Sequence, residues 1–187
     1  MPAPVSIGVN KEMEEIITGS KTIYDGKILR LTVKDVIANG HPAKREIVEK
    51  SGAVAVVPVK DDGKIVMVRQ YRVAVQEELL EIPAGLMDPG EEPLESAKRE
   101  LREETGYTAE NWTQLTEYYP TAGFTNEYIH IYLAQGLTPG ETDFDETEVI
   151  EVEEYTLDEL LTMIKSGEIH DGKTASGIAL AKLEIKG

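Results

Sequence analysis

The N-terminal part of the chain alternates between apolar and polar residues, or carries β-branched residues, in three short segments. They are Lys21–Asp25, Ile28–Ile37 and Glu46–Lys50. Such patterns are typical of strands that bury one face. The dipeptide Asn39-Gly40, which favours a tight hairpin turn, separates the second segment from the third. The pattern predicts a small antiparallel sheet at the N-terminus.

A more apolar region follows this first sheet. Ala53–Val59 reads AVAVVPV and Lys64–Tyr71 reads KIVMVRQY, with the turn residues Asp61-Asp62-Gly63 between them. Two such runs around a glycine-containing turn predict a hairpin in the core. Three further strand-like segments are Leu79–Ile82, Trp112–Tyr119 and Tyr128–Ala134.

Two amphipathic helices are expected near the C-terminus. Leu157–Lys165 has apolar residues at helical spacing and is followed by Gly167, a residue type that commonly ends helices. Ala175–Leu183 is the second such segment. Strands interspersed with helices, without internal repeats, predict a mixed sheet between helices, which is an α/β fold.

A third helix is predicted inside the segment Gly85–Tyr107, which reads GLMDPGEEPLESAKRELREETGY. Pro93 suits the first turn of a helix, and Gly106 suits the position just after its end. An apolar stripe to bury is formed by Leu94, Ala97 and Leu101. The preceding residues contain Pro83, Gly85, Pro89 and Gly90, so we expect a loop there.

Three carboxylates of this helix lie at positions i, i+3 and i+4. They are Glu100, Glu103 and Glu104, and this spacing places them on one helix face. Like charges at this spacing repel one another unless a cation is bound. Hard oxygen ligands suit Mg²⁺ or Mn²⁺. The alternative interpretation is a solvated acidic helix face.

The same segment resembles the Nudix box, G-x5-E-x7-R-E-U-x-E-E-x-G-U, in which U is a bulky apolar residue. The specified positions are filled by Gly85, Glu91, Arg99, Glu100, Leu101, Glu103, Glu104 and Gly106, with Tyr107 as a less typical last residue. The resemblance implies the Nudix fold, an α/β/α sandwich with a mixed sheet. It also implies a hydrolase of nucleoside diphosphates linked to another group.

Most of the chain is also similar to the ADP-ribose pyrophosphatase subfamily. The similar segments read AKREIVEKSGAVAVVPV, VRQYR, EIPAG, YYPTAGFTNE and GEIHDGKTASGIALAKLE. One departure is Ala122 before Gly123, where the subfamily commonly has proline. The resemblance implies cleavage of ADP-ribose to AMP and ribose 5-phosphate. Two alternatives are a hydrolase of another nucleoside diphosphate sugar, such as GDP-mannose, and a nucleotide-sensing Nudix module without catalysis.

The resemblance also implies roles for individual residues. Two to three Mg²⁺ ions, with Mn²⁺ as an alternative, would be held by Ala84 through its carbonyl and by Glu100, Glu103, Glu104 and Glu148. Glu103 and Glu104 would thereby take part in catalysis. The acidic loop Glu141–Glu148 would supply the general base, Glu146. Its alternative interpretation is a solvated acidic loop.

Substrate contacts and structural positions are implied in the same way. The substrate-binding candidates are Arg45, Glu46, Arg72, Leu86, Thr121, Ala122, Gly123 and Glu127. The charged candidates could equally form surface salt bridges. Gly85, Glu91, Arg99 and Gly106 would shape the box itself, and Arg99 would orient the box carboxylates.

Composition narrows the remaining possibilities. The chain has 187 residues, no cysteine and a formal net charge of −16, so we expect neither a disulfide framework nor a nucleic-acid partner. It has no apolar run of membrane-spanning length and no basic start followed by an apolar stretch, so we expect a cytoplasmic protein without membrane contact. The subfamily implies a homodimer formed through an N-terminal segment, residues 1–50, which precedes the hydrolase domain, residues 51–187.

Overall fold

The computed structural model describes residues 14–144 and 149–185. Its described residues separate into two compact units. One contains the residues up to Lys50 together with Thr121–Asn126, and the other contains Ser51–Pro120 and the described residues from Glu127 onward. Each unit is treated by itself below.

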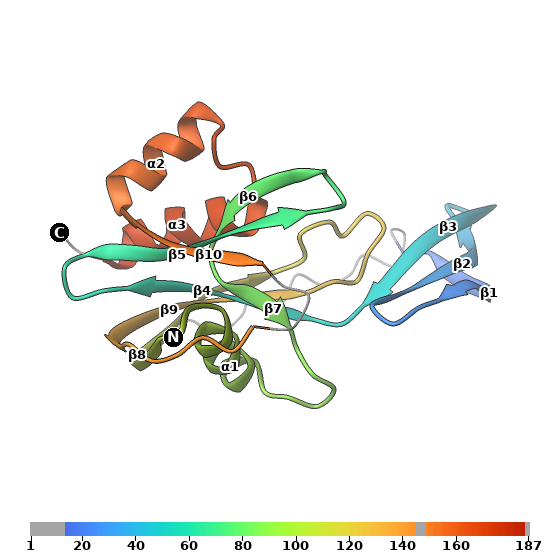
Figure 1. Cartoon of the computed structure of the whole chain (residues 1–187). Coiled ribbons are helices and arrows are strands. Elements are labelled where there is room, and N and C mark those ends of the chain that lie inside the picture. Colours follow the sequence, from blue (N-terminus) through green and yellow to red (C-terminus); the bar gives the residue numbers. More distant parts are fainter. Residues whose placement is uncertain (1–13, 145–148, 186–187) are drawn as a thin grey trace. The chain divides into compact units, whose positions relative to one another are not determined.

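The first unit is a three-stranded antiparallel sheet in the order β1-β2-β3 (Figure 1). Its strands are β1 (Ile16–Asp25), β2 (Leu29–Ala38) and β3 (His41–Lys50). Asn39 and Gly40, at the turn between β2 and β3, both have positive φ angles, 48° and 77°. This geometry is that of a tight hairpin turn, so the predicted N-terminal sheet and its turn are confirmed. The segment Thr121–Asn126 lies beside β3, where the Val48 amide donates to the Phe124 carbonyl at 2.8 Å.

The second unit contains a seven-stranded mixed sheet. Its main path runs β10-β5-β4-β9-β8, with β6 beside β5 and β7 beside β4. The strands are β4 (Ala53–Val59), β5 (Lys64–Arg72), β6 (Glu77–Glu81), β7 (Ala84–Leu86), β8 (Thr108–Tyr118), β9 (Ile129–Thr138) and β10 (Ile150–Thr156). β4 and β9 are parallel, and the other pairs are antiparallel.

Three helices cover the two faces of this sheet (Figure 1). They are α1 (Pro93–Thr105), α2 (Leu157–Ser166) and α3 (Gly172–Glu184). Val54 and Val56 of β4 pack with α1, whereas Ala55 and Val57 pack in a separate cluster with residues of α2 and α3. The alternation of side chains along one strand thus supplies two cores. The predicted α/β/α sandwich is confirmed. Among the described residues, no helix is both long enough and apolar enough to span a membrane.

The predicted core hairpin differs from the structure in its extent. β4 and β5 pair only next to their turn, at Val59 and Ile65. One edge of β4 pairs with β9 along its whole length. The other edge pairs with β7 at residues 53–55, so β7 occupies the place that a continuous hairpin would give to β5.

Two strands were not predicted from the sequence. β7 lies within the segment expected to be a loop, because three residues between prolines and glycines carry no alternating pattern. β10 has the sequence IEVEEYT and follows an acidic loop, and its glutamates have low strand propensity. It forms an outer strand of the sheet through its pairing with β5, where charged side chains remain in contact with solvent.

Candidate active site

The acidic helix α1 is fixed to the sheet by its apolar face. Ala97 and Leu101 are fully buried against Val54 and Val56. Pro93 begins the helix, and Gly106 ends it in a left-handed conformation with its amide bonded to the Arg102 carbonyl. Burial of these two residues fixes the helix and with it the positions of its glutamates.

Arg99 is the centre of the hydrogen bonds on this helix face. Its Nε and Nη2 donate to the two carboxylate oxygens of Glu91 at 3.1 and 3.0 Å. Its Nη1 donates to Glu100 at 2.6 Å and to Glu103 at 3.0 Å. Nη2 also donates to the carbonyl of Leu86 at 3.1 Å. One guanidinium therefore connects the loop before the helix with two of the three clustered carboxylates.

These hydrogen bonds shift the pKa values of the two principal partners in opposite directions. The bonds from Arg99 are the largest cause that lowers the pKa of Glu91 from 4.5 to about 2. The same bonds to Glu91 are the largest cause that raises the pKa of Arg99. Both groups therefore stay charged wherever the protein is folded near neutral pH.

Gly85 lies directly against the carboxylate of Glu100. A Cβ atom on Gly85 would be 2.1 Å from Cδ of Glu100 and 2.2 Å from both of its oxygens. No side chain fits there without displacing Glu100. The glycine that opens the motif is therefore required for the close approach of this carboxylate to the backbone of β7.

Glu104 is nearly buried, with 5% of its surface exposed. It accepts a hydrogen bond from the Ala84 amide at 3.0 Å. A buried carboxylate is costly unless it is hydrogen-bonded or paired, and this bond also ties the end of α1 to the first residue of β7. Glu104 and the Ala84 peptide are thus neighbours.

The carboxylates can converge on a positive centre. Within residues 14–144 and 149–185, no three acidic or histidine side chains are gathered as the ligands of one ion. Arg99 Nη1 nevertheless binds Glu100 and Glu103 together, so a cationic group already stands between these two side chains. Carboxylate and carbonyl oxygens are the ligands that Mg²⁺ and Mn²⁺ prefer, so this donor set fits such an ion.

Arg72, a predicted substrate contact, forms a bidentate ion pair with Glu81. Its Nε and Nη2 donate to the two oxygens of Glu81 at 2.7 and 2.8 Å. The Glu81 side chain is 1% exposed and also accepts from Lys173, whereas the Arg72 side chain is 40% exposed. These bonds to Glu81 are the largest cause that raises the pKa of Arg72. Sequence reasoning missed Glu81 and Lys173, although a glutamate within the apolar run LLEIP is a signal of a paired buried charge.

The other predicted site residues are divided between the two units. Arg45 is paired with Glu15 in the N-terminal unit, where Glu46 and the turn residues Thr121, Ala122 and Gly123 are exposed. Leu86 and Glu127 belong to the second unit, together with the acidic helix. Glu146 and Glu148 lie outside the described residues.

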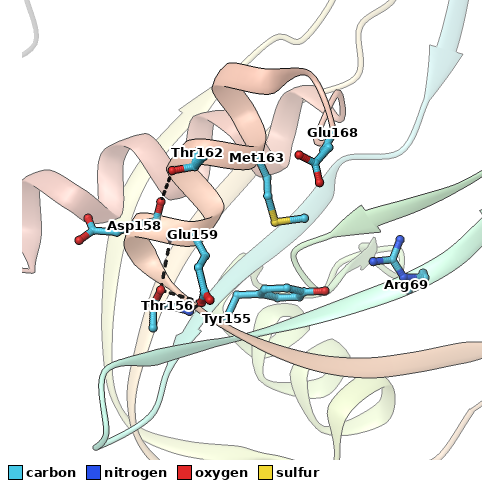
Figure 2. A pocket seen from close by; sticks show the side chains of 8 residues that line it. All are labelled: Arg69, Tyr155, Thr156, Asp158, Glu159, Thr162, Met163 and Glu168. Atoms are coloured by element: carbon cyan, nitrogen blue, oxygen red, sulfur yellow. Dashed lines mark hydrogen bonds between the residues drawn. The ribbon is translucent and has the colours of Figure 1, made fainter.

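A cavity of about 660 Å³ lies on the sheet face opposite α1 (Figure 2). It opens between α2 and the strands β5 and β10, and Arg69, Tyr155 and Met163 are among its lining residues. Thr156 and Glu159 at its edge form the capping box of α2. None of the predicted site residues that the structure describes lines this cavity. The candidate active site is therefore the acidic helix α1 with the adjacent segment 84–86.

Comparison with known proteins agrees with this geometry. A family model described as the NUDIX domain matches residues 49–175. An ADP-ribose pyrophosphatase of Bacillus subtilis (strain 168) is 45% identical over 177 residues, which cover 93% of this chain and 96% of that protein. A methanol dehydrogenase activator of Bacillus methanolicus is 41% identical over 179 residues, 94% of this chain and 97% of that protein. A crystal structure of an ADP compounds hydrolase has the same fold, with a TM-score of 0.83, 24% identity and coverage of 92% of this chain and 94% of that chain.

The lowered pKa of Glu91 predicts a specific pH dependence of stability. Its folded pKa is about 2, below the unfolded value of 4.5, so its stabilising contribution is present above 4.5 and is lost as pH falls toward 2. Glu91→Gln should therefore lower the free energy of unfolding at neutral pH. The difference between wild type and variant should shrink below about pH 4, measured by urea unfolding at each pH.

Glu95→Gln is the matched control, because Glu95 lies on the same helix and pairs only with the exposed Lys98 among the bonds described for its side chain. This control should change stability little at any of these pH values. A difference for Glu91→Gln that stays constant from neutral to acidic pH would contradict the assigned ion pair.

Proposed function

This chain belongs to the NUDIX domain family and is a hydrolase of that family, and we propose that it cleaves the diphosphate linkage of ADP-ribose to AMP and ribose 5-phosphate. The observation that carries the proposal is the 45% identity to an ADP-ribose pyrophosphatase over nearly the full length of both chains. The acidic face of α1, organised by Arg99, supports it with the donor set that such a reaction requires.

We assign the divalent metal to the oxygens of Glu100, Glu103 and Glu104, the carbonyl of Ala84 and the side chain of Glu148. Two to three Mg²⁺ ions, or Mn²⁺ in their place, would neutralise the diphosphate and make a bound water more acidic. The proximity of Glu104 to the Ala84 peptide, and of Glu100 to Gly85, supports a shared site.

The chain's own residues have separate tasks in this proposal. Glu91 holds Arg99, and Arg99 orients Glu100 and Glu103. Glu146 accepts a proton from the attacking water while the oxygen of that water bonds to phosphorus. The bridging P–O bond breaks, and the departing phosphate keeps the bonding electrons. A carboxylate not bound to metal suits this role because a bound cation lowers the pKa of a carboxyl group.

Substrate contacts are assigned to both units. Arg72 and Glu127 of the second unit and Arg45 and Glu46 of the first are the polar candidates. Leu86 in the second unit and the turn Thr121–Gly123 in the first unit are the remaining candidates for substrate contact. The exposed part of the Arg72 guanidinium supports its assignment, because Glu81 fixes its direction while leaving it in contact with solvent.

Three other functions compete with this proposal. GDP-mannose or another nucleotide sugar could use the same metal site, since a divalent metal would neutralise a diphosphate whatever group it carries. The similarity to a methanol dehydrogenase activator favours activation of a dehydrogenase as a second candidate function. A nucleotide sensor without catalysis would not need the complete set of box carboxylates that this chain carries.

A substrate panel tests the main proposal. We expect ADP-ribose to have the highest kcat/KM among ADP-ribose, GDP-mannose, ADP-glucose, NADH, diadenosine polyphosphates and 8-oxo-dGTP, and only when Mg²⁺ or Mn²⁺ is present. Chromatography should identify AMP and ribose 5-phosphate as the products. A higher kcat/KM for another compound would replace ADP-ribose as the proposed substrate. If no compound is hydrolysed, the nucleotide sensor or the dehydrogenase activator would be favoured.

The general base is tested by Glu146→Gln. We expect kcat to fall by about 10² to 10⁴, with KM for ADP-ribose nearly unchanged, because the amide cannot accept the proton but preserves the shape. Glu141→Gln is the matched control in the same acidic loop and should retain activity. Near-normal turnover by Glu146→Gln, measured in single-turnover experiments, would exclude Glu146 as the base.

We also propose that the chain forms a homodimer through an N-terminal segment, residues 1–50. The hydrolase domain is then residues 51–187. The support is the apolar surface of the N-terminal sheet, where Ile16, Ile17, Ile23 and Tyr24 of the edge strand β1 are all more than half exposed. Apolar side chains gathered on one strand usually mark an interaction surface. The absence of cysteine fits a reducing, cytoplasmic location.

Charge introduced on β1 should dissociate the dimer. We expect the double variant Ile17→Asp, Ile23→Asp to sediment as a monomer at micromolar concentration, whereas wild type sediments as a dimer. Leu183→Asp, which places the same charge on a 74% exposed leucine of α3, should remain dimeric. A monomeric wild type, or a dimeric double variant, would contradict the assigned interface.

A further inference from the structure

The segment Glu81–Ala84 joins the end of β6 to the beginning of β7. Its first three residues are buried. On the α1 side, the Pro83 carbonyl accepts from the Val56 amide at 2.9 Å, and the Ala84 amide donates to Glu104. The segment therefore ends at the residue whose carbonyl is assigned to the metal.

The N-terminus of α3 holds the same segment from the opposite sheet face. The Ile82 amide donates to the Thr174 hydroxyl at 3.0 Å, and this hydroxyl donates to Asp171 at 2.6 Å. Thr174 is fully buried. Asp171 also accepts from the Thr174 amide at 3.0 Å, so it fixes the beginning of the helix as its N-cap. The hydroxyl thus accepts from one group and donates to the other.

A second bond from α3 reaches the beginning of the segment. Lys173 donates to the buried carboxylate of Glu81 and to Asp171. Glu81 is at the same time the partner of Arg72. Two neighbouring side chains of α3 therefore bind two neighbouring residues of the segment, one through a backbone amide and one through a side chain.

Close packing leaves this contact little room to move. A Cβ atom on Gly177 would lie 2.9 Å from Cδ1 of Ile82 and 3.1 Å from Cγ2 of Val57. The helix backbone thus lies directly on the Ile82 side chain. A glycine in a helix interior weakens the helix, so its presence here is explained by this close approach.

We propose that Thr174 and Asp171 are positioning residues for the metal site, because they fix the Ile82 amide and, through Pro83, the carbonyl of Ala84. This inference rests on the proposed function, since it uses the assignment of that carbonyl to the metal. Pro83 has a fixed φ angle, so one of the few backbone rotations that could absorb a displacement of Ile82 before it reaches Ala84 is removed. Lys173 reinforces the same position through Glu81.

A purely structural role for Thr174 would attach α3 to the sheet and affect stability alone. A positioning role predicts in addition a change in metal affinity. Replacing the hydroxyl by a methyl group of the same shape leaves the buried Ile82 amide without its partner, so the segment must move to find another. Metal affinity and stability therefore separate the two roles.

The test is Mn²⁺ binding to Thr174→Val, measured by electron paramagnetic resonance without substrate. We expect an affinity about tenfold weaker than that of wild type, which is the usual effect of removing a residue that supports a metal ligand. The Mg²⁺ concentration for half-maximal ADP-ribose hydrolysis should rise by a similar factor. The KM for ADP-ribose at saturating Mg²⁺ should stay unchanged.

Two further variants make the result specific. Thr174→Ser keeps the hydroxyl and should restore the wild-type Mn²⁺ affinity. Thr162→Val removes a hydroxyl of α2 that donates to the Asp158 carbonyl at 2.8 Å, and it should leave Mn²⁺ binding unchanged. Urea unfolding confirms that each variant is folded under the conditions of the binding experiment.

The outcomes distinguish this inference from the proposed function. Weaker Mn²⁺ binding by Thr174→Val, with rescue by Thr174→Ser, supports the inference even if another nucleotide sugar proves to be the substrate. Wild-type Mn²⁺ affinity in a less stable Thr174→Val overturns it, and so does a wild-type protein that binds no Mn²⁺.

Discussion

The geometry of the candidate active site depends on the short pairing between β4 and β5. These strands pair only at Val59 and Ile65, and the freed edge of β4 pairs with β7 instead. A short segment from the interior of the chain thus enters the sheet between two strands that would otherwise form a continuous hairpin. Because α1 packs against β4, the backbone of β7 comes to lie beside the glutamates of that helix. The acidic residues alone would form only a charged surface. The inserted backbone places the Ala84 amide against Glu104.

Local signals were sufficient to predict much of this structure. The first-turn proline, the apolar stripe and the terminal glycine predicted α1 within the motif, and Asn39-Gly40 predicted the N-terminal hairpin. β7 was missed because its three residues carry no alternating pattern, and β10 because its glutamates have low strand propensity. Their conformation is set by pairing with β4 and β5, which is a tertiary effect.

The candidate site likewise has features that nearby residues in the sequence predict and features that depend on residues far apart in the sequence. The spacing of Glu100, Glu103 and Glu104 predicts a common face, and the resemblance to a known motif assigns Arg99 to them. The role of Glu81 could not be derived in this way, because Lys173 lies 92 residues later in the chain. Contacts of that separation leave no periodic pattern in the sequence. These contacts form only when the fold places α3 against the sheet beside Ile82.

The hydrogen bond between Ile82 and Thr174 also limits which contacts can form while the chain is being synthesised. The amide is made 92 residues before its acceptor, and the acidic helix is made between them. At translation rates of about 5–20 residues per second, the growing chain carries its glutamates for several seconds before α3 exists. The Ile82 amide therefore lacks this acceptor until Thr174 has been made and has left the ribosome. A nascent chain that ends before Thr174 consequently lacks this contact between α3 and the end of β6.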